Sequence, residues 1–204
     1  YRSLRIDEMP EVVVDILRFA IEPRDWVRLL VVVGLLTLNA AVVGLAVLIL
    51  QLALGGWTSA NYAALACPDF PACQGQLWPA TDFGEAFVLW REIGVDYEGG
   101  VLDLPARTAI HLAHRIGALV ALLVLGLLAI RLLRDPAARR EGVLLAVLLG
   151  AQILLGIQNV VLHLPLLNAA AHNGTGALLL AMLLWLTFRS RPSQLRTLAG
   201  ARNA

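Results

Sequence analysis

Four long apolar runs dominate the pattern of hydrophobic and polar positions, and each is long enough to form a membrane-spanning helix. A helix needs ~20 residues to cross a bilayer, and the predicted spans cover about residues 28–54, 107–133, 142–163 and 168–188. A polar stretch, residues 55–106, separates the first two spans, whereas the other connections are short. The pattern therefore predicts an all-α integral membrane protein, folded as a four-helix transmembrane bundle.

The charged residues are distributed so that they orient these spans. Arginine is concentrated before the first span, between the second and third spans, and after the fourth, while residues 55–106 are mainly acidic. The positive-inside rule therefore places the N-terminal segment 1–26 and the basic tail 189–204 in the cytoplasm. It makes residues 55–106 a long extracytoplasmic loop of the bundle, which occupies residues 27–188. Segment 1–26 is either a solvated linker or a short helix at the membrane surface.

Composition agrees with this topology and excludes a soluble domain. Hydrophobic residues make up 59% of the 204 residues, and the mean hydropathy of +0.74 is typical of proteins that contact membrane lipid. No nucleic-acid partner is expected. The sequence begins at Tyr1 and not at Met, which favours a partial chain.

All four histidines fall in the outer half of the predicted membrane region, where ionisable residues are costly and commonly functional. His111 and His114 share one face of the second span, His163 ends the third, and His172 opens the fourth. His114 and His172 lie roughly 10 Å and 6 Å into their spans, at about 1.5 Å per residue. Two facing imidazoles at similar depth fit a haem iron with two axial histidines.

Other interpretations of these residues remain open. A histidine near a helix end often only hydrogen-bonds a carbonyl group or interfacial water, which applies most to His163. Zinc or copper is a rival use of the cluster, although no carboxylate or thiolate shares the same faces. Arg115 is suited to pair with haem propionates. Arg107 could do the same, but it fits better as a residue whose charge reaches the membrane surface.

The outer loop carries further candidates. Cys67 and Cys73 lie six residues apart outside the cytoplasm, which indicates a disulfide. It is either a static clip or a pair that exchanges with a redox partner. Glu98 precedes two glycines. It is either a functional residue or a solvent-exposed carboxylate in a turn. Aromatic residues suit a loop folded over the mouth of the bundle at the membrane interface; they are Trp57, Trp78, Phe83, Phe87 and Trp90.

Several motifs along the chain resemble the haem A synthase family, in order and at consistent spacing. The similarity runs from about residue 30 to 188 and does not include residues 1–26. It is carried by Gly55–Tyr62, Ala66–Gly75, His111-x-x-His114-Arg115, Gln152-x-x-x-Gly156-Ile157-x-Asn159, and the segment from Leu164 to His172.

The resemblance implies an oxidoreductase that oxidises the C8 methyl group of haem O to the formyl group of haem A, for use in cytochrome oxidase. Members of the family usually have eight spans in two similar halves. This chain is similar to the C-terminal half, which holds a haem b. The other half would come from a further part of the protein or from a homo-oligomer. The resemblance also implies a multi-pass protein of the bacterial inner (plasma) membrane, with both termini cytoplasmic.

Carried over by position, the family's haem-iron ligands correspond to His114 and His172, with Arg115 in the cofactor-binding set. His111 and Glu98 are the candidate catalytic residues. The pair Cys67 and Cys73 is similar to a redox cysteine pair implicated in the family's function.

The resemblance also implies partners, and two other functions are weighed beside it. The expected partners are haem O synthase or cytochrome oxidase assembly factors, and a thiol–disulfide partner for the cysteine pair. The main alternative function is a non-catalytic bis-histidine b-type cytochrome that transfers electrons from quinol. A third is an assembly factor that binds no haem.

Overall fold

The computed structural model describes residues 23–90 and 101–190, with side chains described from Thr37 onward. Its helices are α2 (Pro23–Ala60), α3 (Phe83–Ala86), α4 (Leu104–Arg134), α5 (Arg139–Val161) and α6 (Leu166–Arg189). Four segments are long and apolar enough to cross a membrane; they are Thr37–Ala60, Leu104–Arg134, Arg139–Val161 and Leu166–Arg189. The predicted all-α, four-span fold is therefore confirmed. Glu98, segment 1–22 and the tail from residue 191 lie outside the described residues.

Local signals in the sequence explain where the helices of the outer loop and second span begin. Asp103 precedes α4, and its carboxylate accepts a hydrogen bond from the backbone N–H of Ala106 at 3.0 Å. Asp82 caps α3 in the same way, accepting from the N–H of Glu85 at 3.0 Å. A carboxylate at this position satisfies a backbone N–H that has no partner inside the helix.

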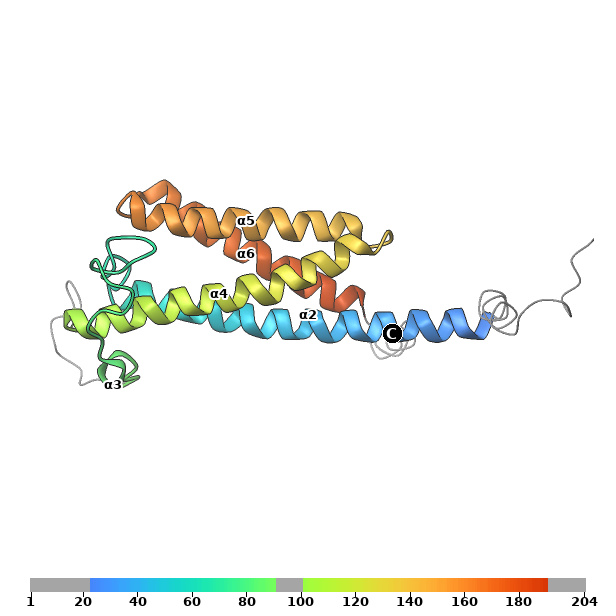
Figure 1. Ribbon diagram of the computed structural model, residues 1–204, viewed down its shortest axis with the longest axis horizontal. Coiled ribbons are helices and arrows are strands. Elements are labelled where there is room, and N and C mark those ends of the chain that lie inside the picture. Colours follow the sequence, from blue (N-terminus) through green and yellow to red (C-terminus); the bar gives the residue numbers. More distant parts are fainter. Residues whose placement is uncertain (1–22, 91–100, 191–204) are drawn as a thin grey trace, which may run out of the picture.

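The four long helices form a closed bundle in which each helix packs against two others (Figure 1). Helix α2 contacts α4 and α6, and α5 also contacts α4 and α6. The N-terminal part of α2 extends beyond the other helices, on the side of the α4–α5 connection.

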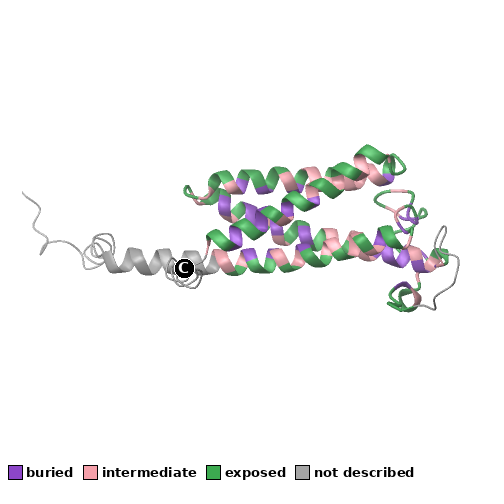
Figure 2. Cartoon of the chain, turned by 180° about the vertical axis from the view of Figure 1, so that it is seen from behind, coloured by how far each residue is buried: buried purple, intermediate pink, exposed green. Residues whose placement is uncertain are grey.

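Leucine-rich packing fills the bundle between these helices. Buried residues lie on the faces that the helices turn toward one another, and exposed residues lie on the outside (Figure 2). The core consists of Ala41, Leu48, Leu125, Leu128, Ala129, Leu132, Leu145, Leu149, Leu179, Met182, Leu183 and Leu186. Gly44 permits close approach, since a Cβ there would lie 2.9 Å from Leu125 Cδ2. Such small residues matter because helices in lipid associate mainly through tight packing.

Polar contacts connect the helices at the end of the bundle opposite the histidines. Arg131 Nε donates to Thr37 Oγ1 at 3.3 Å and connects α4 to α2. Arg189 forms an ion pair with Glu141 and connects α6 to α5. Its guanidinium also lies over the ring of Trp185, 5.3 Å from the centroid.

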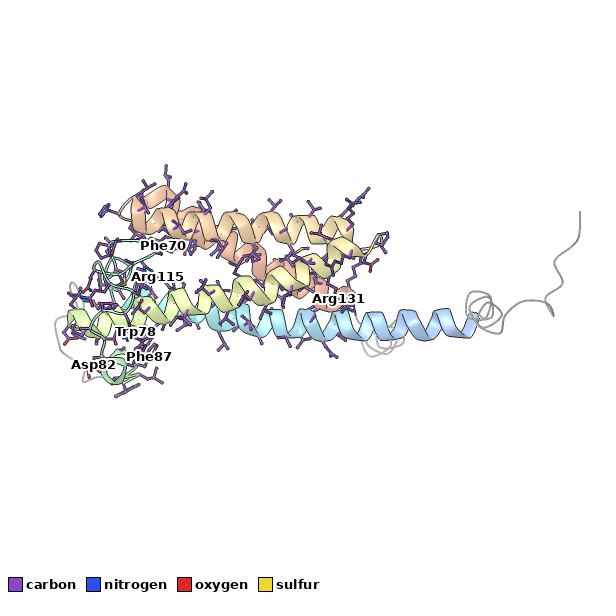
Figure 3. All side chains as sticks on the ribbon, in the orientation of Figure 1. Phe70, Trp78, Asp82, Phe87, Arg115 and Arg131 are labelled. Carbon is purple, nitrogen blue, oxygen red and sulfur yellow. A yellow bond between two sulfur atoms is a disulfide. The ribbon has the colours of Figure 1, made fainter. Side chains whose placement is uncertain are left out.

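The outer loop lies beside the opposite end of the bundle and is attached to it by hydrogen bonds. Trp57 Nε1 donates to the carbonyl of Ala86 at 2.9 Å, and the N–H of Asp82 donates to the carbonyl of Pro105 at 3.2 Å. Figure 3 places Trp78, Asp82 and Phe87 on the opposite side of α4 from Phe70 and Arg115.

Several of the loop aromatics lie at or beside α3. Trp57 packs against a buried cluster of the loop and α4. Trp78, Phe83, Phe87 and Trp90 are exposed, and Trp78 stacks on Phe83 with 6.2 Å between ring centroids.

His163 does not lie on the third span, contrary to the sequence prediction. Helix α5 ends at Val161, and His163 is an exposed residue of the turn before α6. His163 and Leu164 have φ values of 57° and 64°, a left-handed conformation that is unfavourable for residues with a Cβ. The turn stops the helix because the N–H of Leu164 donates back to the carbonyl of Asn159, at 2.8 Å.

Candidate functional site

His114 lies inside the bundle on α4 and is contacted by two residues of α2. Gln51 Nε2 lies 3.1 Å from His114 Nδ1 and also donates to the backbone carbonyl of His114 at 3.0 Å. Gly55 lies one helical turn further along α2, and a Cβ there would come within 3.3 Å of His114 Cε1. The imidazole is therefore held at one nitrogen by an amide and lies closely against the backbone of α2.

His172 lies on α6 and is contacted in the same manner by α5. Gln152 Nε2 lies 3.3 Å from His172 Nε2. A Cβ at Gly156 would come within 3.1 Å of His172 Cε1. At about 1.5 Å per residue, His172 is roughly 9 Å from the start of α6, and His114 is roughly 15 Å from the start of α4. Residues beside the two histidines meet across the bundle, because a Cβ at Gly176, four residues after His172, would lie 3.1 Å from Cδ2 of Leu52, the residue next to Gln51.

His111 lies one turn from His114 but has a different environment. It is buried, at 5% exposure, and its Nδ1 hydrogen-bonds the backbone carbonyl of Ala63 at 3.0 Å. Ala63 belongs to the segment that follows α2, so His111 connects α4 to the start of the outer loop. This is the carbonyl contact expected of a histidine near a helix end.

Arg115 holds the disulfide loop against α4. Cys67 and Cys73 form a disulfide, and both are almost fully buried, at 0% and 1% exposure. Within the loop that they close, the two terminal nitrogens of Arg115 donate to four backbone carbonyls; these belong to Cys67 (3.3 Å), Asp69 (2.7 Å), Pro71 (3.4 Å) and Ala72 (2.8 Å). The guanidinium also lies 5.6 Å from the ring centroid of Phe70 (Figure 3). The loop is thus folded around a residue adjacent to His114.

The carboxylate of Asp69 closes the same loop from the solvent side. Its oxygens accept hydrogen bonds from the N–H groups of Gln74 at 2.6 Å and Gly75 at 2.8 Å. These two residues have positive φ values of 56° and 73°, a geometry that turns successive N–H groups toward an anion. The Gly75 N–H contributes most to holding the pKa of Asp69 below its ordinary value.

We expect Asp69 to titrate below about 3.9, the ordinary value for aspartate. A carboxyl group whose pKa is lowered by folding stabilises the loop above the pKa of the unfolded chain, and this stabilisation is lost as the pH falls through the folded-state value. Carboxyl-carbon NMR of the protein in detergent measures the midpoint, and the amide protons of Gln74 and Gly75 should shift with it. A midpoint at or above the ordinary value would contradict the contacts of Asp69.

The structure allows a test of whether these residues suit a bound haem. Among the described residues, five buried side-chain polar atoms have no hydrogen-bond partner; they are Gln51 Oε1, Arg107 Nε, Arg115 Nε, Gln152 Oε1 and His172 Nδ1. Buried polar atoms are nearly always hydrogen-bonded in native proteins, so orphaned ones require an explanation. Four of the five belong to His172, to the two glutamines or to Arg115 beside His114, whereas Arg107 lies on α4 seven residues before His114. A cofactor with axial and propionate contacts would use ring nitrogens and arginine donors of this kind, so the residues fit the group.

The structure brings together only part of the predicted set. His114 and His172 come together from facing helices, and Arg115 and the cysteines form a unit beside them. His163 lies apart in its turn. In the described part of the chain, no three His, Cys, Asp or Glu side chains form a group that could hold a metal ion.

Sequence reasoning missed the glutamines as functional residues. Gln51 was not singled out from the sequence, and Gln152 was quoted only within the motif Gln152-x-x-x-Gly156 that carries the family resemblance. A usable signal was nevertheless present, because Gln-x-x-x-Gly occurs at Gln51–Gly55 and again at Gln152–Gly156.

Comparison with known proteins gives consistent matches. The family COX15-CtaA, described as "Cytochrome oxidase assembly protein", matches residues 26–184. A "Heme A synthase" of Shewanella oneidensis is 47% identical over 148 residues, covering 72% of this chain and 45% of the relative. A "Heme A synthase" of Methylobacterium radiotolerans is 33% identical over 162 residues, covering 77% of this chain and 40% of the relative. The chain thus spans less than half the length of these relatives. No solved structure matches it significantly.

Proposed function

Because the chain belongs to the COX15-CtaA family of cytochrome oxidase assembly proteins, we propose that its bundle is the haem b-binding half of a haem A synthase. His114 and His172 are the axial ligands in this proposal. The observation that carries it is that each imidazole is contacted by a glutamine and a glycine of a neighbouring helix, with unpartnered buried atoms on both glutamines and on His172.

The residues around the two histidines have separate tasks in this proposal. Each histidine presents the ring nitrogen that its glutamine leaves free, which is Nε2 in His114 and Nδ1 in His172. Arg107 and Arg115 each keep a buried Nε that is available to an anionic group such as a propionate. The terminal nitrogens of Arg115 remain with the disulfide loop. When bound, a haem supplies one-electron redox chemistry, and the protein tunes it through ligands, hydrogen bonds and burial.

The reaction we propose for the whole protein is oxidation of the C8 methyl group of haem O to the formyl group of haem A. The substrate site requires residues beyond this chain, contributed by a further part of the protein or by another subunit. His111 and Glu98 are the proposed catalytic residues. For His111, the support is its position on α4 one turn from His114, since a group there is suited to move a proton near the site.

The location of the protein constrains its partners. Four candidate spans and bacterial relatives make it a bacterial membrane protein. We further propose that both termini are cytoplasmic and that the disulfide loop lies outside. Partners there would be a thiol–disulfide protein for Cys67 and Cys73, while haem O synthase or oxidase assembly factors act in or beside the membrane.

A two-arm expression experiment tests the function. The chain alone, and the chain joined to the remainder of the protein, are purified from membranes and their visible spectra are recorded. Each sample then receives haem O with a reductant and oxygen, and its pigments are extracted and separated by chromatography. We expect a low-spin haem b spectrum in both arms and haem A in the joined arm. Absence of the haem spectrum would overturn the binding proposal, and haem b without conversion in the joined arm would favour the electron-transferring cytochrome.

A further inference from the structure

The bundle contains two similar arrangements of residues, which differ in the ring nitrogen contacted: Nδ1 in His114 and Nε2 in His172. In each copy, a Gln-x-x-x-Gly unit on one helix contacts a histidine on the helix that follows it across the membrane. Gln51 and Gly55 of α2 contact His114 of α4, as described above. Gln152 and Gly156 of α5 contact His172 of α6.

Glycines on the histidine helices complete both copies. Gly117 follows His114 by three residues, and a Cβ at Gly117 would overlap Oε1 of Gln51. Gly176 follows His172 by four residues, and a Cβ there would lie 3.5 Å from Gln152 Nε2. Each glutamine therefore lies in a space that a glycine on the opposite helix keeps open. Two independent occurrences of the same set make an accidental contact a poor explanation.

A glutamine side chain inside the membrane is energetically costly when its amide group is not fully hydrogen-bonded. Taking an amide out of water without complete hydrogen bonding costs roughly 1–3 kcal/mol in proteins. Yet the oxygens of both glutamines are buried without a partner, although either helix could have carried leucine or methionine at these positions. The amide groups are thus directed at the histidines and incompletely satisfied by the protein itself.

We propose that Gln51 and Gln152 are positioning residues, each fixing the orientation of its imidazole and the ring nitrogen presented to bound haem. The proposal rests on the function inferred above. In metal sites, the group hydrogen-bonded to the second ring nitrogen of a ligand histidine selects the tautomer and holds the ring plane. Which partner donates in these contacts follows from that tautomer and from the amide orientation. If each glutamine holds its own histidine in this way, the two imidazole planes keep one defined mutual orientation.

The test compares variants of the full-length protein that keep the side-chain volume. Gln51→Met and Gln152→Met remove the hydrogen bond. Gln51→Glu and Gln152→Glu retain the length, and a carboxyl group that stays neutral in this apolar setting supplies both a donor and an acceptor. Gln158→Met is the matched control, because Gln158 is a half-buried residue of α5 whose side chain makes no hydrogen bond within the described residues.

The readouts are haem dissociation into apomyoglobin and the low-temperature EPR spectrum of the ferric protein, whose g values depend on the mutual orientation of the two imidazole planes. We expect the Met variants to release haem about 10- to 100-fold faster, the usual effect of removing the partner of a metal ligand. Their largest g value should also move. The Glu variants should restore slow release, and Gln158→Met should match the unmodified protein. Unchanged release and unchanged g values in both Met variants would overturn the proposal.

Failure of this inference is distinguishable from failure of the proposed function. If the unmodified protein carries no low-spin haem, the proposed function itself is wrong. If it carries the haem and the Met variants release it faster with unmoved g values, the glutamines only stabilise helix packing, and the positioning role is overturned.

Discussion

Replacing His114 with alanine in the full-length protein is expected to abolish the low-spin haem spectrum, and His172→Ala should do the same. In the proposed site the iron has two imidazole ligands, and no other histidine of this chain is placed to substitute. His111 hydrogen-bonds Ala63 in the segment that leads into the outer loop, one turn away from His114, and His163 lies exposed in the α5–α6 turn. Any haem that remains should be five-coordinate, with a high-spin spectrum. Visible absorption and the haem-to-protein ratio of purified protein measure both outcomes.

Controls separate loss of a ligand from loss of the fold. His163→Ala should leave the spectrum unchanged, because its side chain lies outside the bundle. His114→Gln keeps a polar side chain of similar size and should still lose the signal, since an amide is a poor ligand for haem iron. The variants should elute from a size-exclusion column as the unmodified protein does. An unchanged low-spin spectrum in either alanine variant would refute the assignment of that histidine.

Replacing Arg115 with leucine is expected to free the disulfide loop, because the free energy that holds the loop closed falls by about 3 kcal/mol. Hydrogen bonds from a charged donor contribute about 1.5–3 kcal/mol each and are not additive. Arg115 makes four such contacts, all to carbonyls between Cys67 and Cys73. A loss of this size raises the population of the open loop roughly 100-fold.

The rate at which dithiothreitol reduces the disulfide measures this opening, because Cys67 and Cys73 are 0% and 1% exposed and a soluble thiol reaches them only when the loop opens. Arg115→Leu should accelerate reduction roughly 100-fold when opening is a rapid pre-equilibrium. Arg115→Lys should be intermediate, since an ammonium group cannot span the carbonyls as a guanidinium does.

Arg107→Leu provides the control on the same helix. Its side chain makes no hydrogen bond within residues 37–90 and 101–190, so its removal should leave the reduction rate unchanged. Equal rates for Arg115→Leu and the unmodified protein, or equal acceleration by Arg107→Leu, would show that the carbonyl contacts do not hold the loop.

The four long apolar helices were predictable because apolar length is a local property of the chain. Each predicted span corresponds to one of α2, α4, α5 and α6, and the orientation inferred from the arginines stays a prediction. The ligand candidates were also predictable, since an ionisable side chain within a span is conspicuous whatever its partners are. Depth and the family resemblance selected His114 and His172, and their role as iron ligands stays a prediction.

Other features depended on contacts between segments distant in the sequence. Nothing local indicates that Arg115 donates to carbonyls more than forty residues earlier, or that α3 lies beside the start of α4. The turn at His163 was also missed, because the apolar run continues through it and only the backbone conformation ends the helix. Nothing local indicates either that His111 hydrogen-bonds the carbonyl of Ala63, whereas His114 contacts Gln51.

By itself, the sequence determined that this chain carries four helices long and apolar enough to cross a membrane, and which of its residues are chemically able to bind a cofactor. Only the tertiary structure decided what each of those residues contacts, because hydrogen bonds and close packing depend on three-dimensional distance and not on sequence pattern. The glutamines illustrate this division. Gln51 and Gln152 read as two polar residues in apolar helices, and only the packing of α2 on α4 and α5 on α6 brings each of them to a histidine.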